Sequence, residues 1–352
     1  MCILDDGRQP LVSVIIPAYQ AAGRIRETLD SVFAQTYPNL EVVLVNDGSP
    51  DTEALEQAIR SYGERLTYIR QENRGPSGAR NTAIRAARGK YIACLDSDDI
   101  YLPHHLARLV ALLEEQALDL VYSDCDFTRD GVHVGRYFER VTQTPPVTFE
   151  KLLTEECAVP TSGVVASRQA MIDAGLFDER YRRCEDFDLW VRMSFCGAKM
   201  DLLREVGVEH RLLPDGLASD GYLVKRSLIQ IYQKMLATLP VSAKHIKLIQ
   251  ERIARTEGHC QRDLAKRYLR DGRYAEARAA ADKAAVLLQD WNSRRTALVV
   301  QIAPWAARRF LRLQEARLAR KTKRRAGNTS GPTKNGSARD NQEMQEPKSL
   351  RH

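Results

Sequence analysis

The amino-acid sequence predicts an α/β fold, with a mostly parallel, Rossmann-like sheet flanked by helices and an all-α region after it. Apolar, β-branched segments of strand length recur in the first hundred residues, and a helix-like segment separates each from the next. Strands that alternate with helices in this way form parallel, doubly wound sheets. Strand signals stop at about Lys225. We therefore expect a sheet domain at 1–222, a helical region at 223–320 and a disordered basic and polar tail at 321–352.

Four strands are expected in the N-terminal part, at 11–19, 40–48, 66–72 and 90–96. The segments between them are expected to be helices, because their apolar side chains recur with the 3.6-residue helical period. These side chains are Ile25, Leu29, Val32 and Phe33, then Leu55, Ile59 and Tyr62, then Ala79, Ala83 and Ala87. The alternation continues less regularly to about residue 175.

The helical region contains one segment, 264–287, that resembles a tetratricopeptide hairpin. Small and aromatic side chains stand where the two helices of that repeat approach each other: Tyr268, Gly272, Tyr274, Ala277 and Ala281. A single repeat cannot bury its own apolar face. We therefore expect either the neighbouring helices or a protein partner to cover it.

The composition, with 43% hydrophobic residues in a chain of 352, is that of a globular protein with room for two modest domains. No uncharged run approaches the length that spans a bilayer, and the first ten residues are polar and acidic, unlike a signal peptide. Seven cysteines are scattered without CxxC spacing, so neither a disulfide framework nor a zinc site is indicated. We expect a cytoplasmic protein with reduced, mostly buried thiols.

The net charge of +7 is concentrated near the C-terminus. Between Arg294 and Arg325 there are eleven Lys or Arg residues and one acid, Glu315, so the rest of the chain is slightly acidic. Apolar side chains such as Trp305 accompany these charges. We therefore expect residues 294–325 to contact an anionic membrane surface rather than nucleic acid. The protein would then be peripheral at the inner face of the plasma membrane.

Three carboxylates, Asp96, Asp98 and Asp99, end the apolar segment YIACLDSDD. Ligands of open α/β sheets bind beyond the carboxyl ends of strands, where crowded carboxylates repel one another unless a cation or donor groups hold them. The cluster therefore indicates a divalent cation. The alternative is a loop in which these residues cap a helix that begins near Pro103.

Further polar residues are expected near this cluster. Tyr19 follows the first strand, Asp47 ends the second, and the loop NRGPSGARN after the third leads to Arg80. Because the carboxyl ends of parallel strands align, these residues would share one edge of the sheet. Glu185 and Asp186 open a predicted helix in the segment CEDFDLW.

Five segments resemble, in the same order, the signatures of the inverting nucleotide-sugar glycosyltransferases of family 2, which have the GT-A fold. They are SVIIPAYQ, VNDGSPD, NRGPSGARN, YIACLDSDD and CEDFDLWVRM, within residues 10–220. The resemblance implies transfer of a hexose from a nucleoside-diphosphate sugar, expected to be UDP-linked, to an acceptor hydroxyl with inversion, in polysaccharide or glycoconjugate synthesis. The acceptor would be a glycan, a lipid-linked molecule or a protein.

The resemblance also implies roles for individual residues. Nucleotide-sugar contacts would come from Pro17, Tyr19, Asp47, Asn73, Gly75, Arg80, Asp96 and Ser97. Asp47 would accept hydrogen bonds from the nucleobase, Arg80 would neutralise the diphosphate, and Asp96 would contact the ribose. Asp98 would bind Mg²⁺ or Mn²⁺, which stabilises the departing diphosphate, and His210 is a further candidate ligand.

Asp186 is the implied catalytic base, which takes the acceptor proton as the acceptor oxygen attacks the anomeric carbon, while Glu185 orients the acceptor. Asp99 is expected to cap a helix or to support its neighbours. Trp190 is expected in the core.

Simpler interpretations of these residues remain open. Asp47 lies in a strong turn sequence, and Arg80 suits a solvated helix face. Acids such as Glu185 and Asp186 also stabilise the first turn of a helix, and a lone histidine such as His210 is more often structural.

Two other functions are compatible with the architecture. The first is a catalytically inactive nucleotide-sugar-binding or scaffold protein that acts through the helical region. Such a protein would be free to lose Asp98 or Asp186, and both are present. The second is a sugar-phosphate nucleotidylyltransferase, which would have a glycine-rich loop after the first strand that SVIIPAYQAAG lacks.

Overall fold

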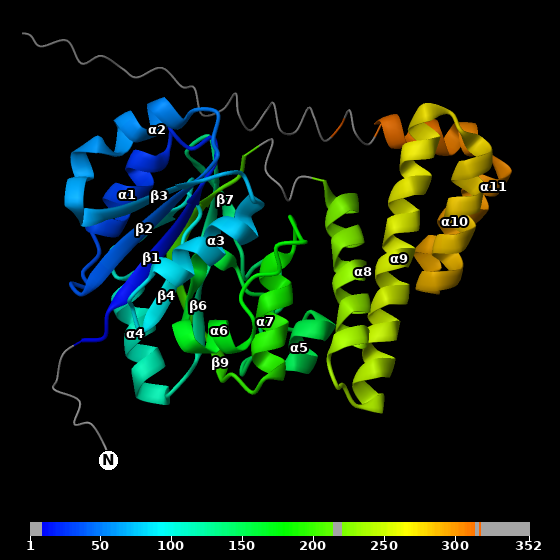
Figure 1. Ribbon diagram of the computed structural model, residues 1–352. Helices are drawn as coiled ribbons and strands as arrows, with labels where there is room; N and C mark the ends of the chain where they lie inside the picture. Colours follow the sequence, from blue (N-terminus) through cyan, green and yellow to red (C-terminus); the bar gives the residue numbers. More distant parts are fainter. Residues whose placement is uncertain (1–8, 214–219, 314–316, 318–352) are drawn as a thin grey trace, which may run out of the picture.

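The computed structural model describes residues 9–213, 220–313 and 317. It contains a mixed, curled sheet flanked by helices, and a helical C-terminal region extends from one side of this domain (Figure 1). The predicted α/β class and the predicted all-α region after it are confirmed. Cys2 and the predicted tail at 321–352 lie outside the described residues.

The sheet contains nine strands within the described residues, in the order β3-β2-β1-β4-β8-β6-β9-β5, with β7 paired to β6. The strands are β1 (Val12–Ala18), β2 (Leu40–Asp47), β3 (Leu66–Gln71), β4 (Tyr91–Cys94), β5 (Ile100–Tyr101), β6 (Leu120–Arg129), β7 (Val132–Arg136), β8 (Val164–Ser167) and β9 (Met200–Arg211). The four predicted strands are β1 to β4, and they run parallel. β8 runs antiparallel to both β4 and β6, so only the N-terminal half of the sheet is uniformly parallel.

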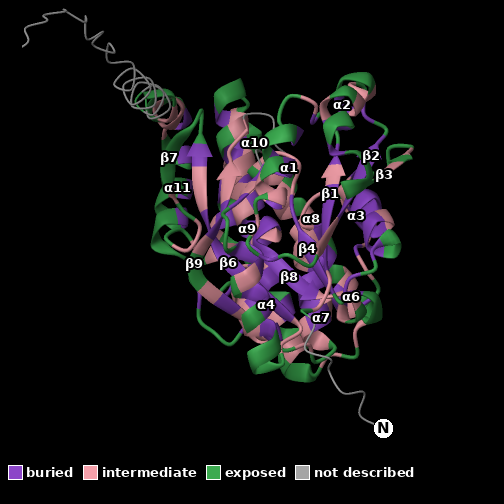
Figure 2. Ribbon diagram, turned by 90° about the vertical axis from the view of Figure 1, so that its left-hand side faces the viewer, coloured by how far each residue is buried: buried purple, intermediate pink, exposed green. Residues whose placement is uncertain are grey.

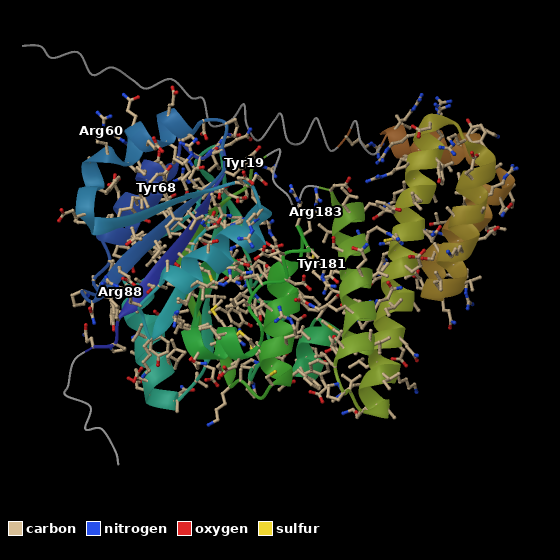
Figure 3. The ribbon with its side chains drawn as sticks, viewed as in Figure 1. Tyr19, Arg60, Tyr68, Arg88, Tyr181 and Arg183 are labelled. Carbon is tan, nitrogen blue, oxygen red and sulfur yellow. The ribbon has the colours of Figure 1, made fainter. Side chains whose placement is uncertain are left out.

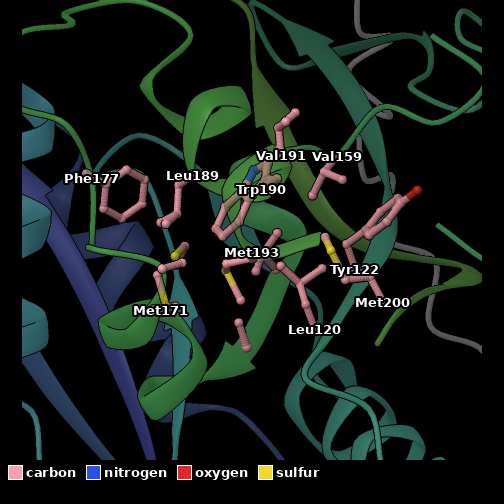
Figure 4. Close-up of a cluster of buried hydrophobic side chains, with 14 of the residues drawn as sticks. Leu120, Tyr122, Val159, Met171, Phe177, Leu189, Trp190, Val191, Met193 and Met200 are labelled. Carbon is pink, nitrogen blue, oxygen red and sulfur yellow. The ribbon is translucent and has the colours of Figure 1, made fainter. Parts of the chain in front are cut away.

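Helices cover both faces of the sheet. One face carries α1 (Ile25–Phe33), α2 (Thr52–Ile59) and α4 (His105–Gln116). The other carries α3 (Gly75–Ala86), α5 (Phe149–Thr154), α6 (Arg168–Asp173) and α7 (Glu185–Phe195). Short 3-10 helices lie at Arg60–Arg65 and Thr161–Gly163. Figure 4 shows part of the core under α7, which contains Trp190. Trp190 is buried, as predicted, and its ring lies edge-on to that of Phe177.

The helical region consists of α8 (Gly221–Thr238), α9 (Ala243–Asp271), α10 (Tyr274–Leu288) and α11 (Trp291–Ile302). Tyr232 of α8 and Ile249 of α9 belong to the same buried cluster as Trp190, so these two helices share the core of the sheet domain. Because of this shared core, the predicted boundary at residue 222 between a sheet domain and a helical region stays a prediction. Within residues 9–213 and 220–313, none of the helices has the length and apolar composition needed to cross a membrane.

A helical hairpin is present where the tetratricopeptide resemblance predicts one. α9 ends at Asp271 and is capped by Gly272, whose φ of +76° glycine adopts readily, and α10 runs back along α9 (Figure 1). Alanines such as Ala277 and Ala281 fill the contact. α11 covers the other side of α10, so a neighbouring helix buries part of the hairpin. Its relation to tetratricopeptide repeats remains a prediction.

Candidate functional site

The carboxyl ends of β1, β2 and β4 meet at one edge of the sheet, because these strands are parallel and adjacent. Tyr19 comes directly after β1 and is 49% exposed at this edge (Figure 3). Pro17 lies within the last two residues of β1, and Asp96 and Ser97 follow β4 as half-buried residues. The predicted aromatic and acidic residues therefore gather at one edge.

Asp47, the last residue of β2, is buried and accepts two hydrogen bonds through Oδ1. The donors are the Gln71 side chain at 2.7 Å and the backbone N–H of Arg74 at 2.8 Å. Gly48 follows with a φ of +62°, and a Cβ there would lie only 2.7 Å from the backbone N of Asn73. Asp47 and Gly48 therefore position the loop in which Asn73 is exposed.

The loop after β1 is held by side chains that sequence reasoning did not single out. Ser49 Oγ accepts from the backbone N–H of Gln20 at 2.7 Å, and Asp51 Oδ2 accepts from that of Ala22 at 2.9 Å. These contacts fix the segment that begins with Tyr19. Hydrogen bonds between two loops leave no repeating pattern in the sequence. The segment VNDGSPD therefore did not indicate that Ser49 and Asp51 bind the loop after β1.

Arg80 is buried in α3, which begins at Gly75, and its guanidinium lies between two carboxylates. Nη2 donates to Asp96 at 2.6 Å, and Nη1 donates to Glu185 at 2.7 Å. Burial disfavours the charge, but Asp96 and Glu185 outweigh it and raise the pKa of Arg80. Arg80 is 5% exposed, so it is not the solvated helix residue that the simpler interpretation expected.

Asp99 is fully buried and supports the residue predicted as a second metal ligand. It accepts hydrogen bonds from Ser162 Oγ at 2.5 Å, from the backbone N–H of Arg211 at 3.1 Å and from His210 Nδ1 at 2.8 Å. Its side chain does not cap α4. Asp99 was expected either to cap a helix or to support its neighbours, and its contacts agree with the second role.

Asp98 and His210 form the candidate metal site. Burial, followed by the charges of Asp99 and Asp96, raises the pKa of Asp98 to about 7. Burial lowers the pKa of His210, but the carboxylates, Asp99 foremost, raise it to about 9. A divalent cation would offset the repulsion among these carboxylates. Because Asp99 occupies Nδ1, the ring nitrogen that would meet a cation is Nε2, which must release its proton to bind the metal.

The residues present therefore fit a divalent cation such as Mn²⁺ or Mg²⁺, with carboxylate oxygen and imidazole nitrogen as donors. In the part of the chain that the structure describes, no group of three His, Cys, Asp or Glu side chains is already assembled around one point. Diphosphate oxygens and water commonly complete the coordination of such ions.

Glu185 and Asp186 begin α7, as predicted, directly after Cys184, which has a left-handed backbone (φ +58°). Asp186 is half-buried, and its Oδ2 accepts a hydrogen bond from the Thr161 hydroxyl at 2.6 Å. The contact of Glu185 with Arg80 connects this turn to Asp96. Arg80 therefore links the first turn of α7 to the residues that follow β4.

Lys234 of α8 connects the helical region to α7. Its Nζ lies 2.7 Å from Asp188, the third acid of the first turn of α7, and 2.8 Å from Asp178. Arg192 donates to the same Asp188 at 2.7 Å, and Asp188 is fully buried. Asp188 therefore has a structural role. Sequence reasoning missed Lys234, because its partners lie on other elements, 46 and 56 residues away.

Comparison with known proteins identifies relatives of both the sequence and the fold. The model of glycosyl transferase family 2 matches residues 13–180. The amylovoran biosynthesis glycosyltransferase AmsB of Erwinia amylovora is 30% identical over 231 residues, which cover 61% of this chain and 75% of AmsB. The uncharacterized glycosyltransferase RP339 of Rickettsia prowazekii is 32% identical over 52% of this chain. The match spans 58% of RP339 and only 27% of a Rickettsia bellii relative.

Two solved structures have a similar fold. TarS of S. aureus (residues 1–349), crystallised with UDP-GlcNAc, superposes with a TM-score of 0.58 at 18% identity over 80% of this chain and 91% of that one. The mannosyltransferase PcManGT of Pyrobaculum calidifontis, in complex with GDP-Man and Mn²⁺, gives a TM-score of 0.57 at 21% identity over 88% and 84%. The sheet and the helices that flank it therefore have the GT-A fold.

Proposed function

The chain belongs to glycosyl transferase family 2, and we propose that it transfers a hexose from a nucleoside-diphosphate sugar to an acceptor hydroxyl with inversion. The observation that carries the proposal is the position of Arg80, which joins Asp96 to Glu185. This contact brings Asp96, a predicted donor-binding acid, next to Glu185, the residue before the predicted base Asp186. The fold similarity to proteins bound to UDP-GlcNAc and GDP-Man supports a nucleotide-sugar donor.

The donor would lie along the edge formed by β1, β2 and β4. Pro17 and Tyr19 would line the nucleobase pocket, and Asp47 would accept hydrogen bonds from the base. Asn73 and Gly75 would contact the nucleotide from the loop after β3, and Asp96 and Ser97 would hold the ribose. A UDP-linked donor remains our expectation.

Asp98, with His210, would hold Mn²⁺ or Mg²⁺. Such an ion would stabilise the negative charge that develops on the leaving diphosphate. The Mn²⁺ complex of PcManGT supports this cofactor. Arg80 was predicted to neutralise the diphosphate directly, but both of its arms bind carboxylates in this structure. We therefore favour a positioning role for Arg80, with its charge acting on the diphosphate at longer range.

Asp186 would act as the base. Its half-buried carboxylate would take the proton of the acceptor hydroxyl while that oxygen forms a bond to the anomeric carbon. The bond from the anomeric carbon to the diphosphate oxygen breaks on the opposite face, and the nucleoside diphosphate leaves with the electron pair. Configuration at that carbon is inverted. Glu185, held by Arg80, would orient the acceptor.

The test is release of nucleoside diphosphate from a panel of UDP- and GDP-sugars, with Mn²⁺ and with EDTA. We expect one donor to be turned over only with metal. Asp98→Ala and Asp186→Asn should each reduce turnover by about 100-fold or more, since each removes a group that acts in the transition state. Asp173→Asn, an exposed acid of α6, serves as the matched control. Native turnover by both site variants would overturn the assignment, and binding of a donor without turnover would favour the scaffold alternative.

A further inference from the structure

The C-terminal helices expose large apolar side chains on an otherwise polar surface. Trp291 and Ile302 of α11 are 75% and 74% exposed, and Trp305, in the helical segment 304–313 that follows, is 66% exposed. Most of α11 is coloured as exposed in Figure 2. The other exposed large apolar residues nearby are Val286, Leu298, Val299, Phe310 and Leu313.

Three of these residues, all on α11, form a stripe with the helical period. In α11, the side chains of Ser293, Ala297 and Val300 are buried, and Ala297 and Val300 pack against α10. Trp291, Leu298 and Ile302 are separated by seven and four residues, so they share the opposite face. The exposed apolar stripe is therefore a second face of α11 in addition to the one that stabilises the fold.

The charged residues of α11 and of the segment 304–313 are all basic. From Trp291 to Leu313 the sequence contains five arginines and no acid. Arg294 and Arg295 are exposed and lie on either side of the line through Trp291, Leu298 and Ile302. An apolar stripe with tryptophan and flanking arginines is the pattern of helices that lie flat in the interface of an anionic bilayer.

We propose that the C-terminal face, formed by the exposed side chains of α11 and residues 304–313, docks on an anionic lipid bilayer. The tryptophans would sit at the headgroup level, and the arginines would contact lipid phosphates. Residues 318–325, which extend the predicted basic stretch, lie outside the described residues. This docking is independent of the proposed transfer reaction, because α11 lies at the far end of the molecule from β3 (Figure 1).

The charge pattern favours lipid over a second copy of this chain. A symmetric dimer through the C-terminal face would bring Arg294 and Arg295 of one copy against the same patch of the other. Repeated like charges across an interface cost binding free energy unless acids separate them. No acid is available between Trp291 and Leu313.

The experiment is sedimentation of the full chain with phosphatidylcholine vesicles, with and without phosphatidylglycerol. We expect binding only to the anionic vesicles, and less of it as salt rises. Ile302→Asp combined with Trp305→Asp should weaken vesicle binding by about tenfold or more, because it places charges where apolar groups enter the interface. Arg294→Glu combined with Arg295→Glu should do the same, since it replaces two residues that attract anionic lipid with two that repel it.

The matched controls make the same types of substitution, an apolar residue to Asp and an Arg to Glu, at exposed sites away from the C-terminal face. Ile172→Asp, on an exposed site of α6, and Arg60→Glu, on the opposite side of the molecule (Figure 3), should leave vesicle binding unchanged. Donor turnover in solution should be native in all these variants, which separates this proposal from the proposed function. Equal binding by native and variant chains would overturn the proposal. So would a dimer that only the aspartate variants break, or tighter binding to a single-stranded RNA than to vesicles.

Discussion

Arg80 holds Asp96 and Glu185 at 2.6 and 2.7 Å, although Glu185 is 105 residues away in the sequence. The guanidinium is buried, and it also lies 5.4 Å from the centre of the Phe177 ring. A planar fork with two donor arms is suited to joining two carboxylates. The proposed acceptor side and the proposed donor side of the site are therefore joined by one side chain.

We predict that Arg80→Leu destabilises the protein by about 3–5 kcal/mol, because it leaves the buried Glu185 carboxylate without its partner. Urea unfolding at neutral pH measures this change. The control is Arg74→Leu, which removes an ion pair with Glu179 in which Arg74 is half exposed, and which should cost less than about 1 kcal/mol. If both variants lost the same stability, Arg80 would have no special role in joining the two sides.

Gly48→Ala should destabilise the site as well as the fold. The φ of +62° disfavours a side chain, and the added Cβ would lie 2.7 Å from the backbone N of Asn73. We expect a loss of about 1–3 kcal/mol in unfolding free energy and a higher KM for the donor. Gly23→Ala is the control, because a Cβ at Gly23 would meet no atom within 4 Å. A native donor KM for Gly48→Ala would mean that this loop does not contact the nucleotide.

The junction between α7 and α8 should be sensitive to acid. Hydrogen bonds from Arg180 and Lys234 lower the pKa of Asp178 in the folded state. An acid whose folded pKa is depressed contributes stability above its unfolded pKa of about 3.9, and this contribution is lost as the pH falls toward the folded pKa.

Urea midpoints measured from pH 5 to pH 3 test this expectation. The native chain should lose stability across this window, and Asp178→Asn should lose less, because the variant no longer titrates there. Asp173→Asn, in which an exposed acid changes, should follow the native curve. Parallel curves for the native chain and Asp178→Asn would contradict the assignment.

The sequence predicts those features that depend on strand ends and on the helical period. Asp47 ends β2 and Asp96 follows β4, the two strands that run parallel on either side of β1, and Trp190 lies in the core, as expected. The antiparallel direction of β8 was not predicted, because a short apolar segment such as VVAS indicates a buried strand but not the direction in which that strand runs. The partners of the acids were also missed: Thr161 meets Asp186 through tertiary packing alone, which leaves no local pattern.

Asp99→Asn should weaken metal binding although Asp99 is not a proposed ligand. Its carboxylate accepts from His210 Nδ1 at 2.8 Å, which would orient Nε2 toward the cation. Loss of such a supporting carboxylate typically reduces metal affinity by about 10–100-fold. Titration of Mn²⁺ in the presence of UDP, followed by electron paramagnetic resonance, measures the affinity without turnover. Asp126→Asn on β6 is the matched control.

Thermal unfolding of the metal-free chain separates this effect from a general loss of structure. If Asp99→Asn lowered the Tm and left the Mn²⁺ affinity of its folded form unchanged, Asp99 would serve only the fold through Ser162 and Arg211. His210→Ala should weaken Mn²⁺ binding at least as much as Asp99→Asn, because it removes the ligand that Asp99 positions. Combining the two changes should then cost little more than His210→Ala alone, since both act through one imidazole.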